Sequence, residues 1–225
     1  MRTNNKSMTE SGFTLVEIAI VLVIIGLLLG GILKGQEMIT QAKIKNVIND
    51  FNGVTAAVNT YQDRYRALPG DDATANVRWA SQGAVQGNGD GALQGVYNAV
   101  STSPLTIAQE SNLFWWHLRL GGFVPGAITG LAAGVQPPNA TNGIIGVQSS
   151  IGGTANLGFS SNIVCSSNLT DKIAIAVDTQ MDDGTPGAGE IRGALQAAPT
   201  PAVPLAGATG YQETGQNQYL LCKNL

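Results

Sequence analysis

The apolar and polar positions of the chain fall into a wholly apolar run, an amphipathic run and a mosaic of short runs. The first run extends from Phe13 to Leu33, and Glu17 is its only charged residue. At a rise of about 1.5 Å per residue, a helix of this length crosses the roughly 30 Å hydrocarbon core of a bilayer. Residues 13–33 are therefore predicted to form a transmembrane helix.

The amphipathic run covers residues 34–68. Its apolar positions recur in alternating steps of three and four, as on one face of a helix. They are Ile44, Val47, Phe51, Val54, Val58, Tyr61, Tyr65 and Leu68. Pro69 and Gly70 then break the pattern. The sequence thus predicts one long helix, roughly residues 13–66, whose second half lies on a sheet.

Residues 69–225 hold short apolar runs between glycine-rich and polar turns, a pattern typical of a globular head. Residues 67–79 are expected to form a turn and an extended loop. A helix is expected over residues 109–122, where Leu113 and Trp116 share one face and Gly121 can end it. Strands are expected at residues 142–151, 156–165, 190–196 and 218–222.

The segment 170–181 fits two elements. Ile173, Ile175 and Val177 alternate as in a strand, whereas Ile173, Val177 and Met181 lie on one helical face. We favour the helix, with Thr170 as its N-cap. The whole pattern predicts an α+β fold, in which a long N-terminal helix packs on an antiparallel sheet.

Charge and residue content exclude several classes of function. The formal net charge is −3 and only 12% of the residues are charged, so no basic surface is expected to bind nucleic acid. His117 is the only histidine, and beside two tryptophans it is interpreted as a packed helix residue. The chain has no nucleophile elbow, P-loop or dinucleotide fingerprint, so we do not expect an enzyme.

The only two cysteines are Cys165 and Cys222. In an exported domain two cysteines favour one disulfide, whereas in a cytosolic fold they favour two free thiols. Long domains that follow a membrane span are translocated largely regardless of the flanking charges. The flanking charges leave the orientation of the span open, but a membrane segment implies export, so we expect the two cysteines to be joined.

The stretch GFTLVE, residues 12–17, resembles the processing site of type IV prepilins and pseudopilins. In that family a dedicated peptidase cuts after the glycine, here Gly12, and then methylates the new first residue, here Phe13. The fifth residue after the cut is a glutamate, here Glu17. The short polar leader, residues 1–12, matches as well. The resemblance implies a pilin-like structural subunit, and the span is expected to remain in the mature protein.

Glu17 needs an explanation, because a carboxylate at the bilayer centre costs about 2.5–3.5 kcal/mol. One interpretation is an interfacial residue that reaches the headgroups. The other follows from the resemblance: cleavage creates an α-amine at Phe13, which is largely cationic at neutral pH. That amine can pair with Glu17 of a neighbouring subunit, and the pairing is strong in a low dielectric. We interpret Glu17 as an assembly signal.

The resemblance also implies partners and a location. The expected partners are other pilin subunits, the prepilin peptidase, an inner-membrane assembly platform and the inner membrane itself. The subunit is expected to be a single-pass inner-membrane protein before assembly and part of a periplasmic or extracellular filament afterwards. We favour a minor pilin, because the head is large, over a major pilin. In such filaments the helix can melt, and glycines near Gly30 and Gly31 are the candidate region here.

Two alternatives stay open. The first is a pseudopilin of a type II secretion system, which has the same N-terminal signature. The second is a monomeric, membrane-anchored binding domain in which Glu17 is incidental.

No cofactor is expected, apart from a candidate Ca²⁺ site. Carboxylates near a glycine turn suit a cation that prefers six to eight oxygens, and some major pseudopilins carry Ca²⁺ in this part of the head. The candidate ligands are Asp178, Asp182, Asp183 and Glu190. Their spacing departs from an EF-hand loop, and we favour a solvated helix end and turn. Asn88 and Asp90, in a glycine-rich loop, are weaker candidates still.

Overall fold

The computed structural model describes residues 14–102, 105–150, 156–198 and 200–225. The leader, Gly12, Phe13 and the end of the strand expected at 142–151 lie outside these residues. The chain divides into two units, Met1–Gln41 and Ala42–Leu225. Helix α1 (Leu15–Tyr65) contributes to both, close to the predicted bounds of 13–66.

In the first unit, α1 carries an apolar surface. Among the described residues, α1 is the one helix long and apolar enough to cross a membrane, with a mean hydropathy of 2.8 in its most apolar window and no part of that window buried. The helix is continuous through Gly30 and Gly31. Melting at these glycines in a filament stays a prediction, because the structure is that of a single chain.

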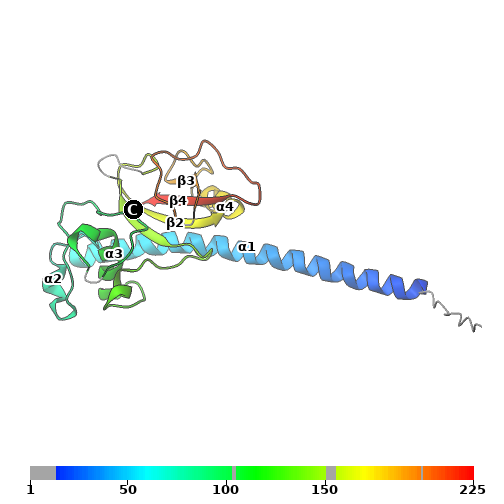
Figure 1. Cartoon of the computed structure of the whole chain (residues 1–225), viewed down its shortest axis with the longest axis horizontal. Coiled ribbons are helices and arrows are strands. Elements are labelled where there is room, and N and C mark those ends of the chain that lie inside the picture. The colour runs from blue at the N-terminus through cyan, green and yellow to red at the C-terminus, as the bar shows by residue number, and fades with distance from the viewer. Residues whose placement is uncertain (1–13, 103–104, 151–155, 199) are drawn as a thin grey trace, which may run out of the picture. The chain divides into compact units, whose positions relative to one another are not determined.

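In the second unit, the remainder of α1 packs along one face of a sheet (Figure 1). The predicted stripe is confirmed. The buried residues of α1 are Ile44, Val47, Phe51, Val54, Ala57, Val58 and Tyr61. Tyr65 and Leu68, the last two predicted positions, are half-buried and pack against the same core.

The sheet has four antiparallel strands in the order β1-β2-β4-β3. The strands are β1 (Ile145–Ser149), β2 (Asn162–Thr170), β3 (Ile191–Leu195) and β4 (Gln218–Asn224). Successive side chains of a strand point to opposite faces. In β4, for example, Tyr219 and Leu221 join the core shared with α1, whereas Leu220 and Cys222 join a second core. This arrangement confirms the predicted α+β, pilin-like architecture.

The expected disulfide between Cys165 and Cys222 is present. These residues face each other directly across β2 and β4, with their Cα atoms 4.0 Å apart, and both side chains are buried. They belong to the core on the sheet face that does not meet α1. The bond therefore joins the two central strands of the sheet, one of which is the C-terminal strand.

Both outer strands are covered by other segments of the chain. The amides of Ile145 and Ser149 in β1 donate to the carbonyls of Pro137 and Leu93, each at 2.9 Å. Tyr97 also lies close to β1, and Gly146 leaves room for it, because a Cβ there would lie 2.0 Å from the Tyr97 carbonyl oxygen. Strand β1 thus has little free backbone to offer another chain.

Strand β3 is covered in the same way. The Gly193 amide donates to the Pro186 carbonyl at 2.8 Å, and the Gly193 carbonyl accepts from Ala208 at 2.7 Å. The Ile191 amide donates to Asp182 Oδ2 at 2.9 Å. Neighbouring segments of the chain therefore occupy the Ile191 amide and both backbone groups of Gly193 on this edge.

Two longer helices complete the head. Helix α3 (Glu110–Leu120) ends at Gly121, as expected, and nearly all of its residues are buried. Helix α4 (Asp171–Met181) confirms the favoured assignment for residues 170–181, and Ile173 and Val177 point into the core. The remaining helices are short, and they are α2 (Ala75–Arg78), η1 (Ala80–Gln82), η2 (Ile107–Gln109) and η3 (Leu131–Gly134).

Two sequence assignments are corrected. The strand expected at 156–165 begins only at Asn162, because Leu157 has a positive φ of 54° and Asn156 organises a turn by bonding to Gly158 and Phe159. The loop expected at 67–79 contains α2. There Asp72 Oδ1 accepts from the Thr74 amide at 2.8 Å and starts the helical turn.

Candidate processing and assembly site

Glu17 lies in the first turn of α1 and bonds to Thr14, the residue that precedes the helix. Glu17 Oε2 accepts from the Thr14 amide and from Thr14 Oγ1, both at 2.8 Å, and the Glu17 amide donates to Thr14 Oγ1 at 3.3 Å. These reciprocal bonds form a capping box, which satisfies backbone groups that the start of a helix leaves unpaired. The local sequence Thr-Leu-Val-Glu therefore fixes the orientation of the glutamate.

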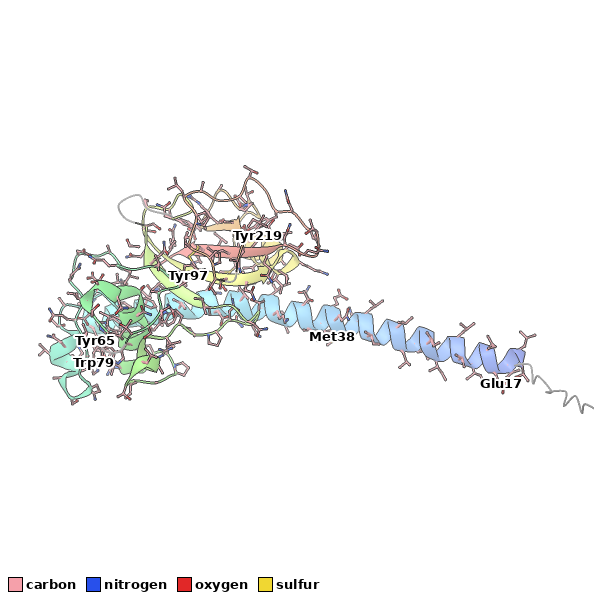
Figure 2. All side chains as sticks on the ribbon, viewed as in Figure 1. Glu17, Met38, Tyr65, Trp79, Tyr97 and Tyr219 are labelled. Carbon is pink, nitrogen blue, oxygen red and sulfur yellow. A yellow bond between two sulfur atoms is a disulfide. The ribbon has the colours of Figure 1, made fainter. Side chains whose placement is uncertain are left out.

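The geometry leaves one carboxylate oxygen available. All the hydrogen bonds between Thr14 and Glu17 that involve the carboxylate end on Oε2, and among the described residues no cation lies within ion-pair distance of Glu17. Around the carboxylate, α1 exposes large aliphatic side chains such as Leu15 and Val16, which are 91% and 66% exposed. Glu17 is thus a single negative charge on an exposed apolar helix (Figure 2).

The predicted cleavage position cannot be placed in space, because Gly12 and Phe13 lie outside the described residues. Their roles, and the pairing of Glu17 with an amine, stay predictions. Thr14 is the residue that the sequence reasoning missed. Its signal was a threonine three positions before a glutamate at the start of an apolar helix, which is the pattern of a capping box.

Three of the four candidate metal ligands lie close together, and the fourth does not. One carboxylate oxygen each from Asp178, Asp182 and Asp183 lies within 4.8 Å of the others, whereas Glu190 is outside this group. Asp178 is wholly buried, Asp182 is half-buried and Asp183 is exposed. The structure thus brings together three of the four residues that the sequence singled out.

Donors within the protein already serve this group. Tyr211 Oη and the Gly184 amide donate to Asp178, and the Ile191 amide donates to Asp182. Burial raises the pKa of Asp178, although the bonds from Tyr211 and Gly184 act in the opposite direction. Three carboxylates with these partners form the end of α4 and the turn to β3, and one oxygen from each supplies three of the six to eight that Ca²⁺ prefers.

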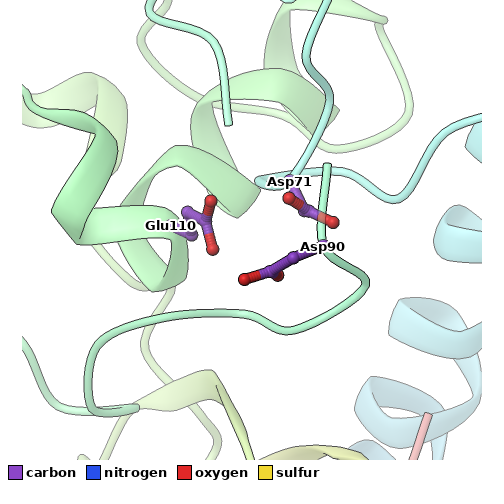
Figure 3. Close-up of side chains that lie close together, drawn as sticks. All are labelled: Asp71, Asp90 and Glu110. Carbon is purple, nitrogen blue, oxygen red and sulfur yellow. The ribbon is translucent and has the colours of Figure 1, made fainter. Parts of the chain in front are cut away.

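A second acidic group consists of Asp71, Asp90 and Glu110, with oxygens within 4.8 Å of one another (Figure 3). Asp71 follows the end of α1, Asp90 lies in the glycine-rich loop 86–95, and Glu110 begins α3. The sequence pointed only to Asp90, since the other two residues are distant along the chain. Their meeting is a tertiary contact with no local signal.

Backbone amides of the glycine-rich loop hold the two buried carboxylates of this group. Asp71 accepts from the amides of Gly89 and Gly91, and Glu110 accepts from those of Asn88 and Gln94 at 2.9 Å. Burial raises the pKa of Glu110; the amide bonds from Gln94 and Asn88 act in the opposite direction, and the two aspartates add to the increase. These bonds shape the loop and give the group a structural role.

His117 confirms its interpretation as a packed residue. It is fully buried, its Nδ1 accepts from the Gly70 amide at 3.0 Å, and its Nε2 lies 2.8 Å from the Val85 carbonyl oxygen. Since Nδ1 is an acceptor, Nε2 carries the proton and the ring is neutral. Burial lowers its pKa to about 4. The residue joins two loops to α3 and has no substrate-facing atom.

Comparison with known proteins gives one match. A search of curated proteins and a search of solved structures found none. The prokaryotic N-terminal methylation motif matches residues 7–33, which span the end of the leader and the whole predicted membrane segment. The motif implies processing by prepilin peptidase and assembly into pilin filaments, and with the apolar α1 it fits a membrane-anchored precursor. Residues 7–33 of this chain therefore carry a prokaryotic N-terminal methylation motif, a signature of type IV prepilins and pseudopilins.

Proposed function

We propose that the chain is a structural subunit of a type IV pilus-like filament, and specifically a minor pilin. Prepilin peptidase cuts it between Gly12 and Phe13 and methylates Phe13. The subunit then enters the filament through α1. The observation that carries this proposal is the exposed Glu17, held by Thr14 on an apolar helix within the methylation motif.

The chemistry of assembly follows from charge balance. Processing removes the leader and leaves an α-amine on Phe13, which is mostly protonated at neutral pH. Glu17 Oε2 is occupied by Thr14, whereas Oε1 can accept from the amine of a neighbouring subunit. In an apolar helix bundle the two charges attract strongly, and an unpaired carboxylate is costly. Pairing therefore stabilises the arrangement of subunits that brings the Phe13 amine of one subunit next to Glu17 of its neighbour.

The head supports a filament that grows through helices. Its outer strands β1 and β3 are covered by the chain's own loops, so strand addition between heads has little backbone to use. The disulfide and the cores keep the head folded as a unit. We place other pilin subunits, the peptidase and an inner-membrane assembly platform as partners. The processed subunit first resides in the inner membrane and then in the filament.

The test is the N-terminal mass of the protein purified from its native membrane or from sheared filaments. An N-methylated Phe13 is the expected result. Gly12→Ala should block cleavage, whereas Glu17→Ala should spare cleavage and impair methylation or assembly. Normal processing and assembly in both variants would overturn the proposal, and an intact Met1 beside an active peptidase would favour a monomeric, anchored binding domain.

A second candidate is a pseudopilin of a type II secretion system. The observation that favours it is the gathering of Asp178, Asp182 and Asp183, in the part of the head where some major pseudopilins carry Ca²⁺. The two functions separate in a deletion strain: loss of exported folded enzymes indicates the pseudopilin, and loss of surface filaments with secretion intact indicates the pilin.

The Ca²⁺ site itself stays a prediction with its own test. If the group binds Ca²⁺, the melting temperature of the full chain rises with added Ca²⁺ and falls with a chelator. Asp183→Asn removes an exposed negative charge but keeps the Oδ1 that accepts from the Thr185 amide at 2.7 Å, and it should weaken that response. An unchanged melting temperature in the wild type would leave the group as a helix end and turn.

A further inference from the structure

Lys43 and Asp50 lie on one line along α1. They are seven residues apart. Seven residues make nearly two turns of a helix, so the two side chains differ by only about 20° in their direction around the helix axis. Both are half-buried at the border of the buried stripe, beside Val47 and Phe51. Both side chains are therefore partly accessible to a second chain.

Neither charge has a partner among the residues of its own subunit that the structure describes. Among the described residues, no salt bridge or hydrogen bond involves Lys43 or Asp50. Burial raises the pKa of Asp50, and no neighbouring cation offsets that effect. Within one helix the two backbones are about 10 Å apart along the axis, so the side chains do not meet directly. Asp50 is a partly desolvated carboxylate without compensation, which is an unfavourable state for a monomer.

We propose that Asp50 pairs with Lys43 of a second copy of this chain, whose α1 runs parallel and is offset by about two helical turns. This inference rests on the proposed function, and it adds a contact in the head unit that no feature of the methylation motif specifies. Each copy presents Asp50 to one neighbour and Lys43 to the next.

The proposed partner is a second copy of this chain, because α1 carries both the cation, Lys43, and the carboxylate, Asp50. A contact between different patches of identical subunits is heterologous, and when it does not close into a ring it generates a helical filament. The order of charges along the chain also agrees with the first pair. In both cases the cation, Phe13 amine or Lys43, precedes the carboxylate, Glu17 or Asp50, so both pairs favour an offset in the same direction.

The direct test exchanges the two charges in the full-length chain, expressed with an active peptidase and assembly machinery. Asp50→Lys should lower the filament yield about tenfold, because it places two lysines opposite each other. Lys43→Asp combined with Asp50→Lys should restore most of that loss. The matched control is Lys45→Asp with Asp50→Lys. Lys45 is exposed and lies about 140° around the helix from residue 50, so it should not rescue.

A crosslinking experiment tests the same pairing if Asp50→Lys fails to fold. Loss of the Cys165–Cys222 disulfide would indicate such a failure. One tagged copy carries Lys43→Cys and a second, differently tagged copy carries Asp50→Cys. Oxidation in the membrane or filament should yield a mixed dimer. The pair Lys45→Cys and Asp50→Cys should yield much less.

The outcomes separate this inference from the proposed function. Wild-type chain that is processed and assembled supports the proposed function by itself. If Asp50→Lys then assembles normally, or if the Lys45 control rescues as well as Lys43, the pairing is wrong and the filament role stands. If the wild type is not processed, the proposed function fails first. Absence of the mixed dimer from assembled wild-type-like filaments likewise overturns the pairing.

Discussion

Tyr61 Oη donates a hydrogen bond of 2.7 Å to Asp72 Oδ2, and both residues are almost completely buried. This bond joins the end of α1 to the loop that follows it. Asp72 also accepts from Thr74 and forms a salt bridge with Arg78. One carboxylate thus organises the turn by which the chain leaves the long helix.

Arg78 extends this cluster outward. Its guanidinium lies 4.3 Å from the ring centre of Tyr65 and 5.0 Å from that of Trp79, and these two rings are in edge-to-face contact. Cations over aromatic faces are stabilised, and the effect grows with desolvation. The cluster therefore fixes α2 against the end of α1.

Removing the carboxylate should be more harmful than removing the hydroxyl. We expect Tyr61→Phe to lower the free energy of unfolding by about 1–2 kcal/mol, since one buried bond is lost. Asp72→Ala should cost about 3–5 kcal/mol, because it leaves Arg78 and Tyr61 without their buried partner. Urea unfolding of the full chain in detergent, followed by tryptophan fluorescence, measures both. Equal losses in the two variants would contradict the central role of Asp72.

Acid should destabilise the head in two steps. Burial lowers the pKa of His117 to about 4 from a usual value near 6.5. The unfolded chain therefore takes up the proton first, and stability falls as the pH drops from about 6.5 to 4, by about 3 kcal/mol in all. Burial tends to raise the pKa of Asp72, but bonds from Tyr61, Arg78 and Thr74 outweigh it and lower the pKa. That contribution to stability is present above the unfolded pKa of about 4 and is lost below it.

The variant His117→Gln isolates the first step. It removes the titrating group while keeping an amide that can reach the Val85 carbonyl. The unfolding free energy of the variant should be lower than that of the wild type at pH 7 and should depend less on pH between 6.5 and 4. Parallel pH profiles for the two proteins would show that another group controls this range.

The disulfide should contribute most of its effect through the unfolded chain. Cys165 and Cys222 are separated by 57 residues, and closing a loop of this length stabilises by about 4 kcal/mol in the chain-entropy account. We expect the double variant Cys165→Ala, Cys222→Ala to lose a stability of this order and to expose the C-terminal strand to proteolysis. Limited proteolysis with mass analysis provides the measurement, and resistance equal to that of the wild type would assign the strand's stability to packing alone.

Local patterns in the sequence account for the elements, and tertiary contacts account for what was missed. The stripe from Ile44 to Tyr61 predicted the packed half of α1, because a helical period of apolar residues implies one buried face. The late start of β2 was missed, since Asn156 builds a turn within an apolar stretch. Helix α2 was missed because it has one turn and depends on Asp72.

The candidate sites also differ in whether a local sequence pattern or a tertiary contact brings their residues together. GFTLVE is a continuous motif, so residues 12–17 could be singled out directly, and the motif match covers them. Asp71 and Glu110 could not be connected from the sequence, because the fold alone brings the start of α3 to the loop after α1. Glu190 was included for its nearness in sequence to Asp182 and Asp183, and the structure leaves it outside the group.

Thr14 provides the last test, because it is the residue that holds Glu17 in the unassembled subunit. Thr14→Val keeps the size of the side chain and removes Oγ1, which accepts from the Glu17 amide and donates to Oε2. Loss of such a cap costs about 1 kcal/mol, so amides in the first turn of α1 should exchange with solvent about fivefold faster. Thr14→Ser retains the hydroxyl and should behave as the wild type.

Amide exchange of the full chain in micelles, read for residues 15–18, distinguishes the cap from a role in processing. If Thr14→Val is cut and methylated normally and only the exchange rates change, Thr14 acts on the helix start. In that case the filament yield of Thr14→Val measures how much the fixed orientation of Glu17 favours assembly. A carboxylate that is already oriented in the free subunit loses less conformational entropy when it pairs with the Phe13 amine of a neighbouring subunit. Unchanged exchange in Thr14→Val would show that Glu17 needs no partner within its own chain.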